Sequence, residues 1–195
     1  MTRKLLIAAL LVAAAAAGYL LRSQLQDQDV AAINTAAVNE QRLEFTLADL
    51  DGVPRDFAEW DGKPRIVNFW ATWCAPCRRE IPLLKDTQDK HGNAGLQILG
   101  IAVDFVEDVK AYAEDAQFNY PILVGQDDAM AVAETSGVPF IGLPFTLIVA
   151  PDGRMLGAHM GEIHAEQIET IVQQFALFES GATTIDEVRS ALKQL

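Results

Sequence analysis

Cysteine is scarce in this sequence: among 195 residues there are two, Cys74 and Cys77. So few cysteines exclude a scaffold held together by several disulfides and a zinc site with four cysteine ligands. Basic residues are also in deficit, since 15 Lys and Arg stand against 27 Asp and Glu and give a net charge of −12. Binding to phosphate groups needs a basic surface, so this composition argues against nucleic acid as a partner. Half of the residues are hydrophobic, which is enough for the core of one domain with additional segments.

The charge is distributed unevenly along the chain. Residues 1–22 contain three basic residues and no acidic one, so residues 23–195 carry −15. Within the first segment, residues 5–21 form an uninterrupted run of 17 uncharged residues. This length favours an uncleaved membrane anchor over a signal peptide cleaved after Ala17, and a buried helix of the folded domain is the remaining alternative. Basic residues ahead of the run keep that end in the cytoplasm, so we expect an extracytoplasmic body anchored in the inner membrane.

The rest of the chain alternates short apolar segments with amphipathic ones. Residues 23–41 are rich in Gln, Asn, Asp and Ala and predict a spacer. The patterns that follow predict strands at 43–47, 53–57, 65–70, 96–103, 120–124, 145–150 and 155–159. Helices are predicted from Cys77 to a glycine cap at His91-Gly92, and at 107–117, 128–136, 165–178 and 184–195. This order indicates an α/β fold with a central mixed β-sheet flanked by helices.

The two cysteines form a Cys-x-x-Cys motif between a predicted buried strand and a helix. That position places Cys74 at a helix N-terminus, where free N–H groups and the helix dipole favour a thiolate. A thiol with a pKa of about 8.5 is only about 3% ionised at pH 7, whereas a pKa of about 7 makes it half ionised. Cys74 is therefore predicted to attack a disulfide, and Cys77, one turn further into the helix, to resolve the mixed disulfide.

Three other interpretations of the motif compete with this one. A zinc site needs two more ligands, and no histidine falls in a zinc-finger spacing with the cysteines. A purely structural disulfide that closes two intervening residues would constrain the unfolded chain very little. A peroxidatic cysteine is expected in a Pro-x-x-x-Thr-x-x-Cys setting, but those positions hold Val67 and Ala71.

The stretch IVNFWATWCAPCRREIP, residues 66–82, resembles the thioredoxin superfamily, and specifically the membrane-anchored TlpA/ResA-like thiol–disulfide oxidoreductases. The resemblance extends over residues 43–178 and implies a thioredoxin-like fold with an N-terminal β-hairpin and a central insert at 105–137. It also implies a substrate groove beside the cysteines, formed by Trp73, Pro76, Leu143 and Pro144, with Pro144 as the cis-proline of the family. Pro82 stands where these proteins kink the active-site helix.

One position departs from thioredoxin itself. Asn68 occupies the site of a buried aspartate in thioredoxin, and an asparagine cannot act as a general base. The TlpA/ResA-like branch also has asparagine there and places a glutamate three residues after the second cysteine, where this chain has Glu80. Glu80 is thus a candidate to accept the proton of Cys77. The alternative is a solvated surface residue beside Arg78 and Arg79.

The resemblance implies a membrane-tethered reductase of disulfides in exported proteins, with apocytochrome c as a family precedent, and an upstream electron donor in the membrane. It implies neither a cofactor nor a metal. An oxidase or isomerase on the same fold and a non-catalytic peptide-binding module remain alternatives. The predicted organisation is an anchor or signal at 1–22, a spacer at 23–41, a thioredoxin-like domain at 42–180 and a helical extension at 181–195. Core packing and a dimer contact are both open for that extension.

Overall fold

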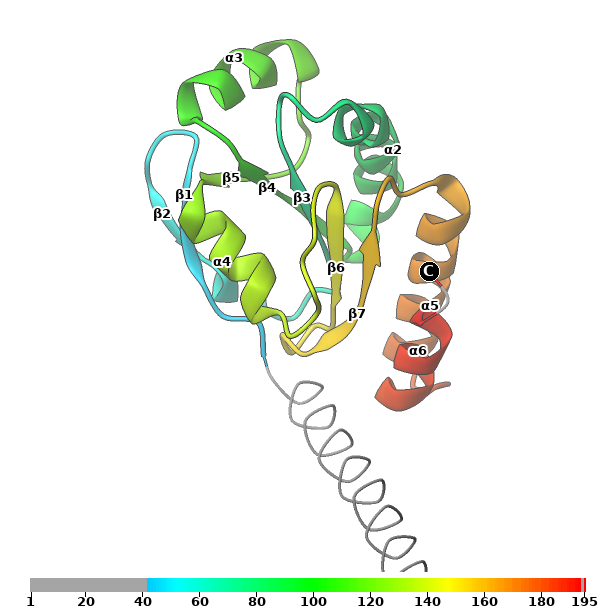
Figure 1. Cartoon of the computed structure of the whole chain (residues 1–195). Coiled ribbons are helices and arrows are strands. Elements are labelled where there is room, and N and C mark those ends of the chain that lie inside the picture. Colours follow the sequence, from blue (N-terminus) through cyan, green and yellow to red (C-terminus); the bar gives the residue numbers. More distant parts are fainter. Residues whose placement is uncertain (1–41, 194) are drawn as a thin grey trace, which may run out of the picture. The chain divides into compact units, whose positions relative to one another are not determined.

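The computed structural model describes residues 42–193 and residue 195 (Figure 1). Strands and helices alternate along most of the chain, as the sequence pattern predicts. The strands are β1 (Thr46–Asp49), β2 (Pro54–Asp56), β3 (Arg65–Trp70), β4 (Gln97–Val103), β5 (Ile122–Gly125), β6 (Phe145–Val149) and β7 (Met155–Met160). The helices are η1 (Phe57–Trp60), α2 (Ala75–His91), η2 (Gly92–Ala94), α3 (Val106–Ala116), α4 (Asp127–Thr135), α5 (Ala165–Glu179) and α6 (Ile185–Leu192).

The seven strands form one sheet in the order β2-β1-β5-β4-β3-β6-β7. Strand β4 pairs in parallel with β3 and β5, and all other neighbours are antiparallel. The predicted mixed sheet and both predicted hairpins, β1–β2 and β6–β7, are therefore confirmed. Helix α3, strand β5 and helix α4 lie between β4 and β6 in the chain, in the region predicted as a central insert.

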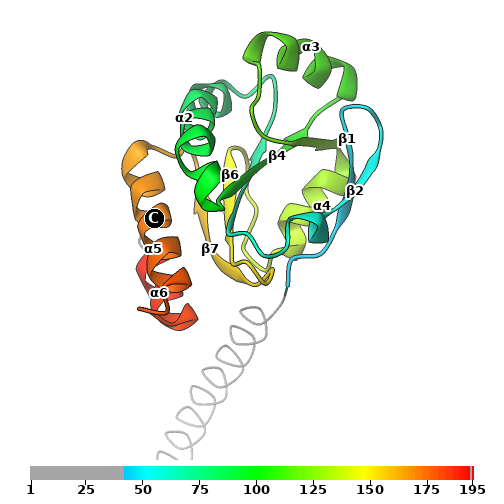
Figure 2. The same cartoon turned by 180° about the vertical axis from the view of Figure 1, so that it is seen from behind.

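Helices cover both faces of the sheet, as the views from opposite sides show (Figures 1 and 2). One core cluster joins the sheet to α2, α3, α5 and α6, and a second joins it to α4 and η1. In β3 the side chains alternate between the two: Ile66 and Trp70 lie in the first cluster, Val67 and Phe69 in the second. Asn68 shares the face of Ile66 and Trp70, so the strand period places a polar side chain beneath α2.

The predicted end of α2 is confirmed, and the chain reverses only at a later glycine. Gly92 does follow the last helical residue, but its backbone is right-handed, with φ −60° and ψ −40°. The chain continues through the 3-10 turn η2 and reverses at Gly95, whose φ is +109°. The left-handed glycine that ends the helical segment is thus Gly95, because one further turn fits between α2 and β4.

Helix α6 is part of the core. The predicted capping box is present at its N-terminus, and Val188 and Leu192 are buried in the cluster that also contains α5. The helix approaches β7 so closely that a Cβ added at Gly157 would lie 3.1 Å from Cβ of Leu192. Nε of Arg189 also donates to the carbonyl oxygen of Met155 at 3.1 Å. The structure therefore shows core packing for the C-terminal helix.

No helix in the described part of the chain is both long and apolar enough to cross a lipid bilayer. The predicted anchor at 5–21 and the predicted spacer at 23–41 lie outside the described residues.

Candidate active site

The two cysteines lie at the N-terminus of α2, directly after the turn that follows β3. Cys74 is the N-cap residue: its backbone is extended, and its Sγ accepts a hydrogen bond from the amide N–H of Cys77 at 3.3 Å. The two sulfurs form a disulfide, with the Cα atoms 5.3 Å apart. The predicted place of Cys74 at a helix N-terminus is confirmed, so backbone N–H groups stand ready to stabilise negative charge on its sulfur.

Access to the two sulfurs is unequal. Cys77 is completely enclosed, whereas 5% of Cys74 remains exposed. Trp73, immediately before Cys74, is 69% exposed. A partner sulfur therefore approaches from the side of Trp73 and Cys74, with Cys77 behind the disulfide.

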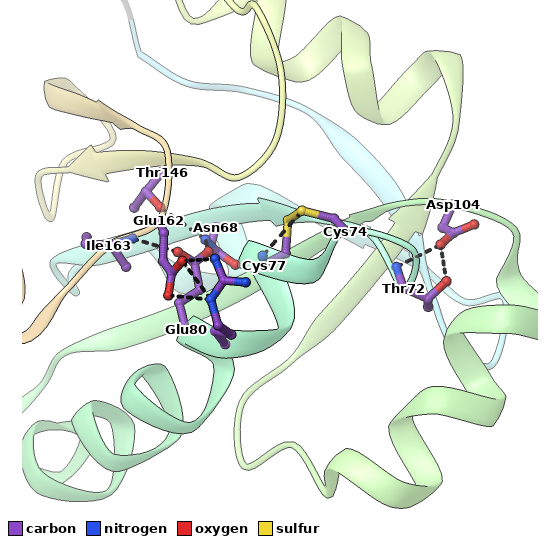
Figure 3. The surroundings of a disulfide bond; sticks show 10 residues. Asn68, Thr72, Cys74, Cys77, Glu80, Asp104, Thr146, Glu162 and Ile163 are labelled. Carbon is purple, nitrogen blue, oxygen red and sulfur yellow. Dashed lines mark hydrogen bonds and ion pairs between the residues drawn. A yellow bond between two sulfur atoms is a disulfide. The ribbon is translucent and has the colours of Figure 1, made fainter.

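Glu80 lies buried one helical turn beyond Cys77, with only 2% of its surface exposed. Its Oε1 accepts from Nδ2 of Asn68 at 2.7 Å, and its Oε2 accepts from the backbone N–H of Ile163 at 2.7 Å (Figure 3). Asn68 is in turn held by Thr146, whose Oγ1 lies 3.1 Å from the same nitrogen. The alternative of a solvated surface glutamate is thereby wrong, and the predicted position on the helix face of Cys77 is correct.

Burial raises the pKa of Glu80 to about 7. The hydrogen bonds from Ile163 and Asn68 act in the opposite direction, because they stabilise the carboxylate, and the nearby charge of Glu162 adds to the increase. Glu80 thus changes between an acid and a base near neutral pH. This is the range in which a proton acceptor for a thiol is most useful.

A second carboxylate, Asp104, holds the turn before the cysteines, and the sequence analysis did not single it out. Asp104 follows β4 and is 7% exposed. Its Oδ2 accepts from the backbone N–H of Thr72 at 2.9 Å and from the Thr72 hydroxyl at 2.6 Å (Figure 3). Its Oδ1 accepts from the N–H of Phe105. A signal was available, because parallel strands β3 and β4 end at the same edge, so residues that follow them meet there.

The residues predicted to form the groove divide into exposed and buried members. Trp73 is exposed, Pro76 lies in the first turn of α2 and is half-buried, and Pro144 is buried. The bond between Leu143 and Pro144 is cis, as the resemblance implies. Pro144 directly precedes β6, whose first residue, Phe145, pairs with β3 one residue before its end, so the proline lies at the same end of the sheet as the cysteines.

The structure also bears on the metal and peroxidase interpretations. Among the described residues, no group of three or more His, Cys, Asp or Glu side chains could hold a metal ion. Val67 and Ala71, which occupy the positions of the peroxidatic motif, are fully buried and apolar. Neither position therefore offers a hydroxyl to the sulfur of Cys74.

Fold and site together define the class as a thioredoxin-like protein with a redox-active cysteine pair. Residues 38–156 match the AhpC/TSA family, and the chain belongs to that family. It is 30% identical over 163 residues to the thiol-disulfide oxidoreductase ResA of Geobacillus kaustophilus, covering 83% of this chain and 89% of that one. It is 27% identical over 138 residues to ResA of Bacillus thuringiensis, covering 70% and 78%.

A solved structure agrees with these relatives. The thiol:disulfide interchange protein of Chlorobium tepidum matches with a TM-score of 0.61 and 29% identity, covering 68% of this chain and 92% of that one. The chain is accordingly a ResA-like thiol–disulfide oxidoreductase, and the predicted enzyme class and thioredoxin-like fold are confirmed.

Proposed function

We propose that the chain is a membrane-tethered reductase that transfers two electrons to disulfides in exported proteins, with Cys74 as the attacking thiol and Cys77 as the resolving thiol. The observation that carries this proposal is the burial of Glu80 one turn behind Cys77, while Cys74 is the sulfur that retains some exposure. A carboxylate at this position opposes negative charge on Cys77. It therefore disfavours the ionised reduced form relative to the disulfide, which supports electron donation rather than oxidation.

The reaction conserves protons and electrons. The Cys74 thiolate attacks one sulfur of the substrate disulfide, forms a mixed disulfide and releases the other substrate sulfur, which takes up a proton. Glu80 then accepts the proton of Cys77, and the Cys77 thiolate attacks Sγ of Cys74. The Cys74–Cys77 disulfide forms, and the second substrate sulfur leaves and takes up the proton held by Glu80. The substrate gains two electrons from the enzyme and two protons, one from Cys77 through Glu80 and one from water, to which Cys74 lost its proton on ionising.

The groove residues have a proposed role in this reaction. Trp73, Pro76, Leu143 and Pro144 bind the polypeptide on either side of the substrate disulfide. Exposed apolar side chains next to Cys74, directly after Asp104 and in the segment before Pro144 support this role, since Trp73, Phe105 and Ile141 are 69%, 62% and 81% exposed. Apolar groups that remain exposed are a feature of surfaces that bind other proteins.

The cellular setting is part of the proposal. We place the body outside the cytoplasm, tethered by residues 1–22 through a spacer at 23–41, because the +3 segment precedes the −15 remainder. The catalytic domain then comprises residues 42–180, and the extension 181–195 completes it. An oxidising compartment would convert the cysteine pair to the disulfide, so the reductase needs an electron donor in the membrane. Apocytochrome c is the substrate that the family resemblance suggests.

Trapping tests the proposal in the full-length chain. Cys77→Ser leaves the mixed disulfide unresolved, so we expect exported proteins to accumulate on Cys74 in the native membrane and to be released by a reductant. Cys74→Ser is the matched control and should trap nothing. Absence of trapped partners in Cys77→Ser would reject a catalytic exchange and favour a peptide-binding module.

The direction of electron flow is tested by the reduction potential of the cysteine pair. We expect a value nearer to about −270 mV, as for thioredoxin, than to about −120 mV, as for DsbA. Equilibration with glutathione and thioredoxin buffers measures it. A potential close to that of DsbA would overturn the reductase assignment in favour of an oxidase or isomerase.

A further inference from the structure

The loop between β7 and α5 is bound at three successive residues. The N–H of Gly161 donates to the carbonyl oxygen of Pro144 at 2.9 Å. The carboxylate of Glu162 pairs with the guanidinium of Arg79. The N–H of Ile163 donates to Oε2 of Glu80 at 2.7 Å. The loop thus connects the proline of the groove with the buried carboxylate behind the cysteines.

Arg79 and Glu80 are consecutive in α2 but point to different surroundings. Glu80 is buried, whereas the side chain of Arg79 is 61% exposed and reaches across the surface to Glu162. Nε of Arg79 lies 3.0 Å from Oε2 and 3.2 Å from Oε1 of Glu162, and Nη2 also contacts Oε2. This two-nitrogen geometry fixes direction as well as distance. Exposed ion pairs contribute little to global stability, so its effect is on geometry.

We propose that Arg79 and Glu162 are positioning residues for Glu80: their ion pair holds the loop so that the amide N–H of Ile163 points at the Glu80 carboxylate. In the described part of the chain, the hydrogen bonds of these two side chains join them to each other and not to the cysteines. Two adjacent residues of α2 thereby bind two adjacent residues of the loop: Arg79 pairs with Glu162, and Glu80 accepts from Ile163. The consequence for the reaction rests on the proposed role of Glu80 as the proton acceptor of Cys77.

Loss of the pair changes the proton affinity of Glu80 in a defined direction. The bond from Ile163 stabilises the carboxylate and lowers its pKa, so a displaced Ile163 raises that pKa above its present value of about 7. Removal of the Glu162 charge acts in the opposite direction, but its effect on the pKa is smaller than that of the Ile163 bond. The charged or titratable groups that face Glu80 are Cys77 on α2, Glu162 on the loop and Tyr120 before β5, with Arg79, His159 and His164 around Glu162. Burial raises the pKa of Tyr120 above its usual value, so this phenol stays neutral.

The decisive variant is the double substitution Arg79→Gln/Glu162→Gln, which removes the ion pair without changing the net charge. Carboxyl ¹³C NMR of the disulfide form measures the Glu80 titration while neither cysteine titrates, with Glu80→Gln to assign the signal. We expect the pKa of Glu80 to rise by about half a unit to one unit. The amide of Ile163 should exchange with solvent about tenfold faster. Arg79→Lys keeps one charged contact, so the rise in the Glu80 pKa and the faster exchange of Ile163 should both be smaller in this variant.

Arg78→Gln is the matched control, because it removes the same charge from the same turn of α2 and Arg78 is not paired with Glu162. It should leave the Ile163 exchange rate unchanged and shift the Glu80 titration less than the double variant does. The proposal is overturned if the double variant titrates like the wild type, or if Arg78→Gln shifts Glu80 equally. The first result would show that the ion pair does not set the proton affinity of Glu80. The second would show that the positive charge on this turn of α2, and not the position of the loop, sets it.

The rate of mixed-disulfide resolution separates this proposal from the proposed function. With a raised Glu80 pKa, the double variant should be about twofold to fivefold slower at pH 7 and recover at higher pH. If the NMR titration shifts and the pH profile of the rate does not, the positioning of Glu80 stands and its role as proton acceptor is rejected. If the double variant lost its global structure, the rate would fall at every pH and Arg79→Lys would decide. Wild-type Ile163 exchange and a wild-type Glu80 titration in Arg79→Lys would then overturn the proposal.

Discussion

The side-chain nitrogen of Asn68 lies 2.7 Å from Oε1 of Glu80, and its oxygen, Oδ1, is buried with no hydrogen-bond partner in the described part of the chain. In this orientation Asn68 is a donor, which suits the ionised carboxylate. Rotation of the amide would present Oδ1 to a protonated Glu80 instead. Asn68 therefore accommodates both protonation states of the carboxyl without exchanging a proton itself.

The first prediction concerns the rate at which Cys77 resolves a mixed disulfide. Glu80→Gln removes the proton acceptor while keeping size, so we expect resolution at pH 7.5 to slow by about tenfold to a hundredfold and to lose its inflection near pH 7. Stopped-flow release of a thiol attached to Cys74 measures this step. Asp86→Asn, at an exposed position of the same helix, should react like the wild type. An unchanged rate in Glu80→Gln would reject the proton role.

The second prediction concerns stability as a function of pH. Glu80 has a pKa of about 7 in the folded protein, above the value of about 4.3 in an unfolded chain. Between these values the folded state holds a proton that the unfolded state has released, so stability falls as the pH rises through this window. Glu80→Gln lacks that loss. We expect the disulfide forms of variant and wild type to be equally stable near pH 4, and the variant to be more stable by up to about 3 kcal/mol at pH 8.

Urea unfolding at the two pH values measures the difference, in which the contributions of all other titrating groups cancel. A difference that does not change between pH 4 and pH 8 would contradict a raised pKa at Glu80.

The third prediction concerns the turn that carries Cys74. Asp104→Ala leaves the N–H and hydroxyl of Thr72 and the N–H of Phe105 without their acceptor. We expect a loss of about 2 to 4 kcal/mol in the free energy of unfolding and a slower first attack by Cys74. Asp115→Ala, an exposed acid on α3, is the control and should change stability by less than about 0.5 kcal/mol. Equal stability of the two variants would show that Asp104 does not hold the turn.

The fourth prediction concerns the C-terminal helix. Leu192→Ala removes a buried side chain from the contact with β7, so we expect a loss of about 2 to 5 kcal/mol. Ser190→Ala, on the exposed side of α6, should stay within about 0.5 kcal/mol of the wild type. Thermal or urea unfolding gives both values. A neutral Leu192→Ala would mean that α6 is a detachable extension.

Local patterns predicted most of the fold. Apolar alternation at 43–47 and short apolar segments elsewhere located the strands of the described residues, and Thr184 and Glu187 correctly marked the start of α6. The end of α2 at His91, with Gly92 as its cap, was also predicted correctly, but the further 3-10 turn that ends at Gly95 was not, because it depends on the distance to β4. The contact of α6 with β7 joins segments that are distant in sequence, so no local pattern could show which face of the sheet it covers.

The site was predictable where one motif carries it and unpredictable where separate segments meet. The pattern around Cys74 indicated the chemistry, and the helical spacing from Cys77 placed Glu80 on the correct face. The same spacing could have indicated burial, because Glu80 stands in a stripe with Ile81 and Leu84. Ile163, which binds Glu80, and Asp104, which binds Thr72, come from other elements, and both contacts depend on strand register.

The contact between Arg189 and Met155 has a consequence for the free border of the sheet. Strand β7 lies at one border of the sheet, and its first carbonyls alternate in direction. The carbonyl oxygen of Arg154, just before β7, accepts from the N–H of Ala150 and points into the sheet. The carbonyl of Met155 therefore points outward, where a strand of another protein could pair with it. The guanidinium of Arg189 donates a hydrogen bond to this carbonyl oxygen. Helix α6 thus occupies one of the edge groups of β7 to which a further strand could add.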